Sequence, residues 1–313
     1  ERVVEEDKQQ KKVNSEKKSV LNYSSYISLI FLSAVWGSSF IFIKLSVESI
    51  QPILLTFYRL AIASIFLFFF CEISKIKTLF LNNKKDLFVI ALIGNVVPFN
   101  LISWSELYVD SLIASTLIGT MPLFTFIISL FFFKETFKKV KVLTGLLIGF
   151  FGMYVFMDPQ GSISKNLNLF FSLLIIISSI FYAFSANWVK TLKNKSSLEL
   201  AFSSIAVATV ICLIMILVSI SIQDNSINLS ITKLTFKSIV SATILGVLCT
   251  GLAIWVFFKL IEKENAVFAS QSNYLIPCFG FLWSFIFLDE RLTLNLFMGL
   301  ILIVLGAYLV NNK

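Results

Sequence analysis

The sequence predicts an all-α integral membrane protein of ten transmembrane helices, arranged as two five-helix inverted repeats around a central cavity. Hydrophobic residues make up 57% of the chain and charged residues only 14%, whereas a soluble domain carries about 25% charged residues. The apolar residues gather in uncharged runs of about 18–24 residues, enough to cross a hydrocarbon core of ~30 Å. A block near the middle, Pro122–Glu135, aligns without a gap on Pro277–Glu290 near the end.

The apolar runs divide into ten predicted spans. In chain order they cover residues 26–47, 53–71, 87–108, 111–133, 140–157, 168–189, 199–221, 236–258, 265–288 and 294–311. Only Val109 and Asp110 separate the third span from the fourth, but one helix of their combined length would not fit the bilayer. Residues 36–44 also resemble 182–190, and 57–64 resemble 202–209. Span order is therefore kept across the two halves.

Three regions follow from this division: a polar tail over residues 1–25, a first repeat over 26–157 and a second repeat over 168–311. The tail mixes lysines with acids, which is typical of a disordered cytoplasmic segment. The first apolar run is too long for a cleaved signal peptide and lacks its small-residue cleavage pattern.

Positive charge is distributed unevenly between alternate loops. One set of loops holds only Lys44, Lys165, Lys233, Lys237 and Arg291, and the other set, with the tail, holds many more lysines. Because lysine and arginine concentrate on the cytoplasmic side, both termini are expected there. Five spans per half then give the halves opposite topology, with the 134–141 loop inside and the 289–291 loop outside. The net charge of +8 is therefore a topology signal and not a nucleic-acid surface.

Ordered motifs run along both halves. They are residues 34–40 with Lys44, Pro52 followed by Phe57-Tyr58-Arg59, 104–111, the 122–135 block, 251–253, 274–277 and 288–292. Together they resemble the EamA-type branch of the drug/metabolite transporter superfamily, whose ten-span members contain two EamA repeats. The resemblance covers about residues 26–311. It implies export or exchange of small metabolites such as amino acids across a bacterial inner (plasma) membrane, with membrane lipid and a small-molecule substrate as partners and no cofactor.

Arg59 is a basic residue inside the second predicted span, toward its outer end. A charge there costs about 2.5–3.5 kcal/mol on insertion scales, so the side chain is expected to face the protein interior or water. Its counterpart in the second half is Ser204, so packing shared by the two halves does not require an arginine. Arg59 is either a counter-charge for an anionic group or a side chain that snorkels to the interface.

Glu106 lies deeper in an apolar flank than any other acid, near the outer end of the third span. It could pair with Arg59, which lies toward the same face. It could instead be a carboxylate that binds and releases protons, since burial perturbs titration, and proton coupling is compatible with that role. A third interpretation is an ordinary interfacial residue.

Polar and aromatic residues in other spans complete the candidate cavity. Asn95 and Asn100 interrupt the third span, and polar clusters surround Asn187 and Asn273 in the sixth and ninth. Such groups line a cavity or form hydrogen bonds between helices, and tryptophans line a pocket or form the interfacial belt. The candidate set is Trp36, Ser39, Arg59, Asn95, Asn100, Trp104, Glu106, Tyr182, Asn187, Gln271, Asn273 and Tyr274.

Prolines and glycines inside the spans have separate expected roles. Pro98, Pro122 and Pro277 are predicted helix kinks that shape the gates, with substrate contact as the alternative. Two pairs of glycines spaced seven apart predict close helix packing. The pairs are Gly145 with Gly152 and Gly299 with Gly306.

The leading functional hypothesis is a secondary transporter in which two inverted halves alternate access to a central site. The sequence has no phosphate-binding GxxxxGK[ST] motif, so direct ATP use is not expected. A channel-like facilitator is the alternative. A membrane-embedded enzyme is disfavoured because the chain has no histidine and offers no catalytic or metal-binding cluster. Substrate, direction, coupling ion and oligomeric state stay open.

Overall fold

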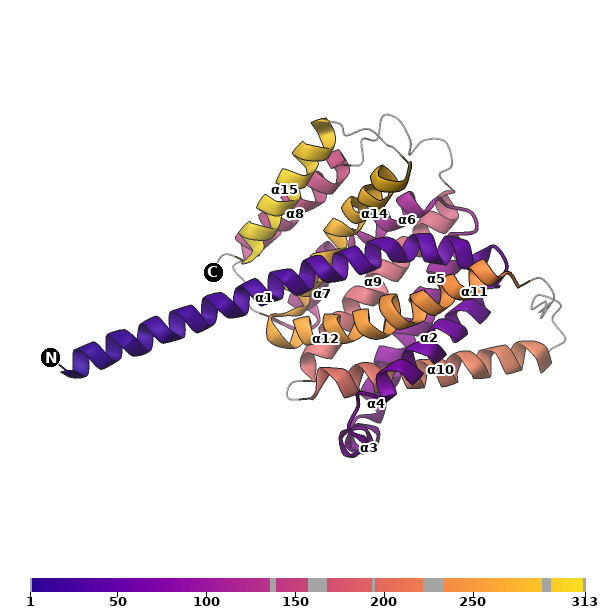
Figure 1. Cartoon of the computed structure of the whole chain (residues 1–313), viewed down its shortest axis with the longest axis horizontal. Helices are drawn as coiled ribbons and strands as arrows, with labels where there is room; N and C mark the ends of the chain where they lie inside the picture. Colours follow the sequence, from indigo (N-terminus) through magenta and orange to yellow (C-terminus); the bar gives the residue numbers. More distant parts are fainter. Residues whose placement is uncertain are drawn as a thin grey trace.

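The computed structural model describes residues 2–135, 139–156, 168–192, 195–221, 234–288 and 294–311, and every regular element in these ranges is a helix. The first repeat contains α1 (Arg2–Val47), α2 (Pro52–Phe68), α3 (Ile73–Asn82), α4 (Lys84–Ala91), η1 (Leu92–Val96), α5 (Val97–Ser105), α6 (Ser111–Ile118), α7 (Met121–Phe131) and α8 (Lys139–Phe156). The second contains α9 (Leu169–Thr191), α10 (Ser197–Ser221), α11 (Phe236–Ile244), η3 (Leu245–Leu252), α12 (Ala253–Lys263), α13 (Ala266–Ser270), α14 (Ser272–Leu288) and α15 (Leu294–Asn311) (Figure 1).

Each predicted span coincides with one helix or with a consecutive run of helices. In the described part of the chain, six stretches are long and apolar enough to cross a membrane, and three shorter apolar helices accompany them. The predicted fold class, an all-helical membrane protein with two repeats, is confirmed.

The N-terminal segment differs from its prediction. The sequence predicts a disordered tail over residues 1–25, but α1 is helical from Arg2 onward, and Figure 1 shows its first part extending away from the bundle. Glutamate, lysine and glutamine fill this segment. These residues are good helix formers, so the composition that suggests disorder also permits a helix.

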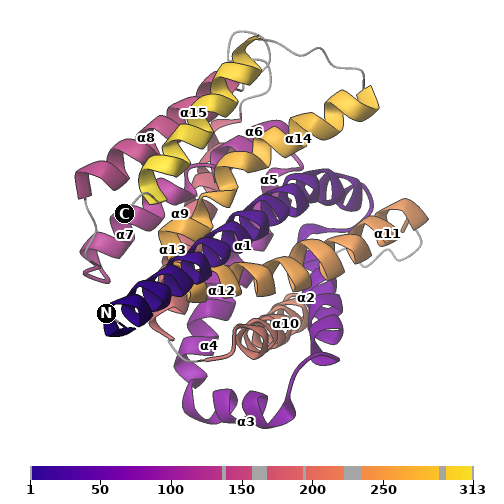
Figure 2. The same ribbon diagram turned by 60° about the vertical axis from the view of Figure 1, so that its left-hand side comes forward.

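The main contacts between a helix of the first repeat and one of the second have equivalent contacts between their counterparts. α1 packs on α14, and its counterpart α9 packs on α6 and α7. Likewise α5 packs on α9, and α11 and α12 pack on α1. The remaining counterparts pack on each other, α2 against α10 and α8 against α15 (Figure 2). The two repeats therefore form one bundle with approximate twofold symmetry.

Glycine lets α8 and α15 approach closely at one edge of the bundle (Figures 1 and 2). A Cβ atom added at Gly145 would lie 2.8 Å from the carbonyl oxygen of Gly306. One added at Gly152 would lie 2.7 Å from the amide nitrogen of Ile303. Real Cβ contacts are longer than this, so the predicted packing role of the glycines is confirmed.

Four spans are interrupted, the third and eighth at matching places in the two repeats and the fourth and ninth at places that differ by a few residues. The π-helical turns η1 and η3 interrupt the third and eighth spans, and non-helical residues separate α6 from α7 and α13 from α14. Interrupted backbone at membrane depth is tolerated where it is buried or lines a cavity, and π-helical turns often mark functional sites. The interruptions therefore indicate a functional site inside the bundle.

Candidate functional site

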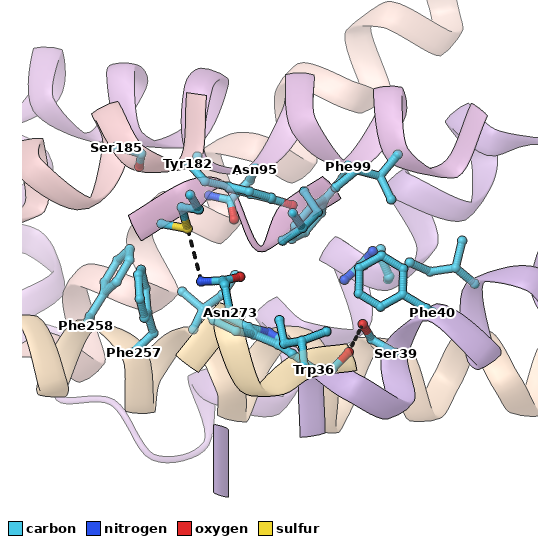
Figure 3. Close-up of a pocket in the computed structure, with 18 residues that line it drawn as sticks. Trp36, Ser39, Phe40, Asn95, Phe99, Tyr182, Ser185, Phe257, Phe258 and Asn273 are labelled. Atoms are coloured by element: carbon cyan, nitrogen blue, oxygen red, sulfur yellow. Dashed lines mark hydrogen bonds between the residues drawn. The ribbon is translucent and has the colours of Figure 1, made fainter. Parts of the chain in front are cut away.

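A cavity of about 90 Å³ lies between the two repeats, and residues of both interrupted and continuous helices line it. Figure 3 shows aromatic side chains on opposite sides of this space, with the amides of Asn95 and Asn273 between them. Its lining residues are Trp36, Ser39, Phe40, Ile43, Arg59, Gly94, Asn95, Phe99, Ile102, Ile118, Met121, Tyr182, Ser185, Ile254, Phe257, Phe258, Asn273 and Ile276. The wall is thus apolar and aromatic, with a few polar groups of fixed position.

Arg59 is the cationic group of the cavity wall. Its side chain is only 4% exposed, which does not fit a side chain that snorkels to the interface. Its Nε donates a hydrogen bond to Thr250 Oγ1 at 2.9 Å, and its guanidinium carbon lies 3.9 Å from the centre of the Phe99 ring. No Asp or Glu of the described residues lies within ion-pair distance of it.

The two π-helical turns present equivalent polar side chains to the centre. Asn95 of η1 donates from Nδ2 to the carbonyl of Ile90 at 3.4 Å, and Thr250 of η3 donates from Oγ1 to the carbonyl of Leu245 at 2.8 Å. Both bonds reach five residues back along the chain. The Oδ1 atom of Asn95 is buried and has no hydrogen-bond partner, so it can accept a hydrogen bond from a ligand.

Other polar groups in the wall are held by bonds within the protein. Asn273 donates from Nδ2 to Met121 Sδ at 3.2 Å and to the Ser270 carbonyl at 2.9 Å (Figure 3). Ser39 donates to the carbonyl of Trp36 at 2.7 Å. The indole of Trp36 donates to the Cys249 carbonyl of η3 at 3.1 Å, which fixes its ring in the wall.

Six predicted cavity residues line this space and six do not. Trp36, Ser39, Arg59, Asn95, Tyr182 and Asn273 line it; Asn100, Trp104, Glu106, Asn187, Gln271 and Tyr274 lie elsewhere. The difference comes from helix rotation, which fixes the face that each side chain occupies, and for Trp104 and Glu106 from their position at the end of α5.

Three of the residues outside the cavity bond to neighbouring backbone instead. Asn187 donates to the Thr125 carbonyl at 3.0 Å and to the Ala183 carbonyl at 2.9 Å, tying α9 to α7. Tyr274 donates to the Leu146 carbonyl of α8 at 3.0 Å. Gln271, at the junction of α13 and α14, donates to the Val267 carbonyl at 3.4 Å. These side chains thus make the interhelical and local hydrogen bonds that were the alternative to a place in the cavity wall.

Two more are directed away from the centre. Asn100 donates to the carbonyl of Val96 at 2.8 Å, within its own helix. Trp104 is 43% exposed and packs edge-to-face on Phe170 and Phe171. An exposed tryptophan near the end of a span fits the interfacial belt.

Glu106 ends α5 and is fully buried. Its Oε2 accepts a hydrogen bond from Ser111 at 3.0 Å, and no ion pair with Arg59 is formed. Lys44 donates to the backbone carbonyl of Glu106 at 2.6 Å. In the second repeat, Lys190, the counterpart of Lys44, donates to the carbonyl of Glu264 at 2.9 Å, and Glu264 ends α12. A cation at a helix C-terminus is electrostatically favourable.

The prolines mark the interrupted spans unequally. Pro98 follows η1 at the start of α5, and Pro122 stands at the start of α7, directly after the break at Gly119 and Thr120. Pro277 lies inside α14, several residues after the break at Gln271. The break precedes it because it follows α13, which Asn265 caps by accepting from the Phe268 amide at 2.8 Å. The role of the three prolines as kinks that shape the gates stays a prediction. Glu290, which ends the repeated block and aligns with Glu135, lies outside the described residues.

Sequence reasoning missed Thr250 and the aromatic pair Phe257 and Phe258. Phe257 and Phe258 line the cavity, and Thr250 holds Arg59. The available signal was the equivalence of the third and eighth spans, because the alignment of Pro122 with Pro277 also places Asn95 opposite Thr250. A polar residue at a matched position in both repeats was therefore detectable.

Comparison with known proteins gives one consistent result. The EamA-like transporter family matches residues 24–157 and again residues 169–312. An uncharacterized transporter of Archaeoglobus fulgidus is 28% identical over 92% of this chain and 99% of its own length. The uncharacterized transporter YoaV of Bacillus subtilis is 22% identical over 90% of this chain and 95% of its own length. A protein of known crystal structure shares the fold, with a TM-score of 0.66 at 14% identity over 92% of this chain and 96% of its own. The chain belongs to the EamA-like transporter family, with one copy of the family's repeat in each half.

Proposed function

We propose that this transporter moves a small carboxylate metabolite, an amino acid with an apolar or aromatic side chain, by alternating access of its two repeats. The observation that carries the proposal is Arg59, a buried cation in the cavity wall whose polar side-chain partner is the uncharged Thr250. A desolvated charge is unfavourable until it is paired. A substrate carboxylate supplies that partner, because guanidinium groups bind carboxylates through two parallel hydrogen bonds.

The rest of the cavity matches the other parts of an amino acid. Oδ1 of Asn95, which has no hydrogen-bond partner among the described residues, can accept from an ammonium group, and the rings of Trp36, Phe99 and Phe257 offer apolar and cation–π surface. The volume of about 90 Å³ lies below the ~300–1,000 Å³ of drug-sized ligand pockets, which favours a small metabolite. A dry cavity of ~150 Å³ holds one benzene ring, so an aromatic amino acid requires the wall to widen when the site opens.

The two ends of the bundle support alternating access. Lys44 with Glu106, and Lys190 with Glu264, make equivalent helix-end contacts in the two repeats. Ser25, in the part of α1 where the bundle begins, donates to Glu264 Oε1 at 2.7 Å. Lys44 lies 19 residues further along the same helix, and at a rise of 1.5 Å per residue the two residues are about 28 Å apart. Equivalent contacts at opposite ends allow one end to open while the other stays closed. Export or exchange across the plasma membrane is the direction that we propose.

The test is counterflow of radiolabelled L-phenylalanine in proteoliposomes that contain the purified protein. Arg59→Ala should raise the apparent dissociation constant at least about tenfold, the equivalent of ~1.4 kcal/mol, and Arg59→Lys should restore it only in part because lysine lacks the two-pronged contact. Lys237→Ala is the matched control, since it removes an exposed cation that pairs with Glu48 at 3.2 Å.

A second arm separates the carboxylate contact from general damage. Phenethylamine, which lacks the carboxylate, should compete equally weakly with wild type and Arg59→Ala. Unchanged counterflow in Arg59→Ala would overturn the assigned role of the arginine. Flux without saturation or counterflow would favour the channel-like alternative.

A further inference from the structure

Glu106 is a buried acid without a cationic partner. Its side chain is 0% exposed, and Oε1 has no hydrogen-bond partner. Oε2 accepts one hydrogen bond, from the Ser111 hydroxyl at 3.0 Å. Among the described residues no lysine or arginine lies within ion-pair distance. An ionised carboxylate in such surroundings is costly, whereas the neutral acid is compatible with them.

The charged and titratable groups around Glu106 come from three elements. Lys44 of α1 donates to its backbone carbonyl at 2.6 Å, and not to its carboxyl group. Arg59 of α2 interacts with it electrostatically from the cavity wall, and Tyr182 of α9 stands near Arg59. Among the described residues, Arg59 is thus the buried guanidinium that interacts with Glu106, and in the function proposed above it also binds the substrate carboxylate.

Glu106 also lies directly beyond one end of the cavity. Its amide donates to the carbonyl of Ile102 at 2.9 Å, one helical turn away, and Ile102 lines the cavity. Ser111, which bonds to Glu106, also donates to the carbonyl of Phe40, another lining residue, at 3.3 Å. The hydroxyls of Ser103 and Ser105 nearby in α5 are buried without partners. Buried polar atoms of this kind are commonly satisfied by water, which can conduct a proton.

We propose that Glu106 is the proton-binding site that couples proton movement to transport, which rests on the function proposed above. With the substrate carboxylate on Arg59, the Glu106 carboxylate takes up a proton and forms one O–H bond. When the substrate leaves, that O–H bond breaks, the proton leaves with the substrate, and the carboxylate turns from Ser111 toward Arg59, with which it forms no ion pair in the structure. The buried arginine therefore has one negative partner in each state, and one proton moves in the same direction as each substrate carboxylate, so export is driven by the outward substrate gradient and is opposed by an inward proton gradient.

Substrate exchange and net substrate flux depend differently on the protonation of Glu106. Exchange of substrate for substrate needs only the loaded, protonated form to change its orientation, so it does not require the empty form to return. Net flux requires the empty form to return, and that form needs an ionised Glu106. Glu106→Gln imitates the protonated acid permanently. It should keep counterflow and lose both net flux and the accompanying proton movement.

The experiment measures L-phenylalanine counterflow, net L-phenylalanine flux and internal pH in the same proteoliposomes. Glu48→Gln is the matched control, because Glu48 is exposed and pairs with Lys237 at 3.2 Å, and it should behave as wild type. Net flux in wild type without proton movement, or proton-linked net flux in Glu106→Gln, would overturn the inference. Absence of counterflow in wild type would instead refute the proposed function.

A second variant decides the question if Glu106→Gln does not fold. Ser111→Ala removes the donor to Oε2, and a carboxylate that loses a donor binds its proton more tightly. The pH at which net flux is half-maximal should therefore rise while counterflow is unaffected. An unchanged pH profile in Ser111→Ala would count against Glu106 as the proton site.

Discussion

At the scale of single residues, the ability of the cavity to bind a ligand depends on which polar groups in its wall have hydrogen-bonding capacity left over. Arg59 bonds to Thr250, and Oδ1 of Asn95 has no partner. In contrast, Asn187 and Tyr274 use their polar atoms to join helices. Polar side chains of the same type therefore separate into binding candidates and structural bonds according to what is left unbonded.

Thr250 is expected to position Arg59. Thr250→Val removes the acceptor of a buried charged donor, a change that costs about 1.5–3 kcal/mol for hydrogen bonds to charged groups, so substrate affinity should fall roughly tenfold or more. Thr250→Ser should restore most of it because the hydroxyl returns. Ligand-induced thermal shift with L-phenylalanine measures the apparent affinity of each variant.

Thr209→Val provides the control for this change. Thr209 donates at 2.9 Å to the Ile205 carbonyl of its own helix and does not line the cavity. The same chemical substitution should leave the affinity unaltered there. Equal affinities in Thr250→Val and wild type would show that Phe99 alone holds the guanidinium.

At the scale of elements, the glycine contact between α8 and α15 and the interrupted spans have different roles, the first in packing and the second in placing polar side chains. The continuous pair α8 and α15 packs backbone on backbone. The spans with η1 and η3 carry Asn95 and Thr250 to the centre. The close pair α8 and α15 thus belongs to the frame, and the interrupted helices share the site with the continuous helices α1, α2 and α9.

The frame should be sensitive to a single methyl group. Gly145→Ala places a Cβ atom 2.8 Å from the Gly306 carbonyl oxygen, and overpacking of this kind costs about 1–3 kcal/mol. The midpoint of thermal unfolding in detergent should fall. Gly280→Ala is the matched control, because its added Cβ would meet nothing nearer than the Gly37 carbonyl oxygen at 3.9 Å.

Both substitutions add the same helix propensity, since alanine is favoured over glycine by ~1 kcal/mol in a helix. Their difference therefore reports the contact. A Gly145→Ala protein as stable as Gly280→Ala would mean that α8 and α15 separate easily, and the close approach would not stabilise the bundle.

At the scale of the whole molecule, approximate twofold symmetry relates the two ends of the bundle. Helix contacts exchange in pairs between the repeats, and Lys44 and Lys190 make equivalent bonds at opposite ends. The cavity lined by Arg59 and Asn95 lies between these ends. This is the geometry that alternating access requires.

The orientation of this symmetric bundle in the membrane is a prediction from lysine distribution. Single cysteines at Asp110 and Asn82, in a background without the native Cys71, Cys212, Cys249 and Cys278, should separate the two faces. Both positions are exposed. In intact cells an impermeant thiol reagent should label Asp110→Cys and not Asn82→Cys, because positive charge keeps the latter face cytoplasmic.

Permeabilised cells provide the control, since both cysteines should then react. Labelling of Asn82→Cys in intact cells, with Asp110→Cys protected, would reverse the orientation. The fold and the cavity would be unaffected, but the Glu106 end would then face the cytoplasm.

The sequence by itself determined the helical membrane fold, the two repeats and half of the candidate cavity residues. Apolar runs of membrane length leave the backbone few alternatives to helices, and matched blocks such as 122–135 and 277–290 reveal the duplication. Arg59, Asn95 and Asn273 were found because charged and amide groups are costly in an apolar span, whatever the packing.

Only the tertiary structure decided which polar groups meet. A π-helical turn rotates the residues that follow it, so the faces of Asn95 and Thr250 could not be read from a regular helical period. Asn187 and Asn273 have the same side chain, and both lie among polar residues of an apolar span. Asn187 nevertheless bonds to the backbone of α7, whereas Asn273 lines the cavity. Burial costs depend on composition and can be read along the chain, whereas hydrogen-bond partners depend on helix rotation and on neighbours distant in sequence.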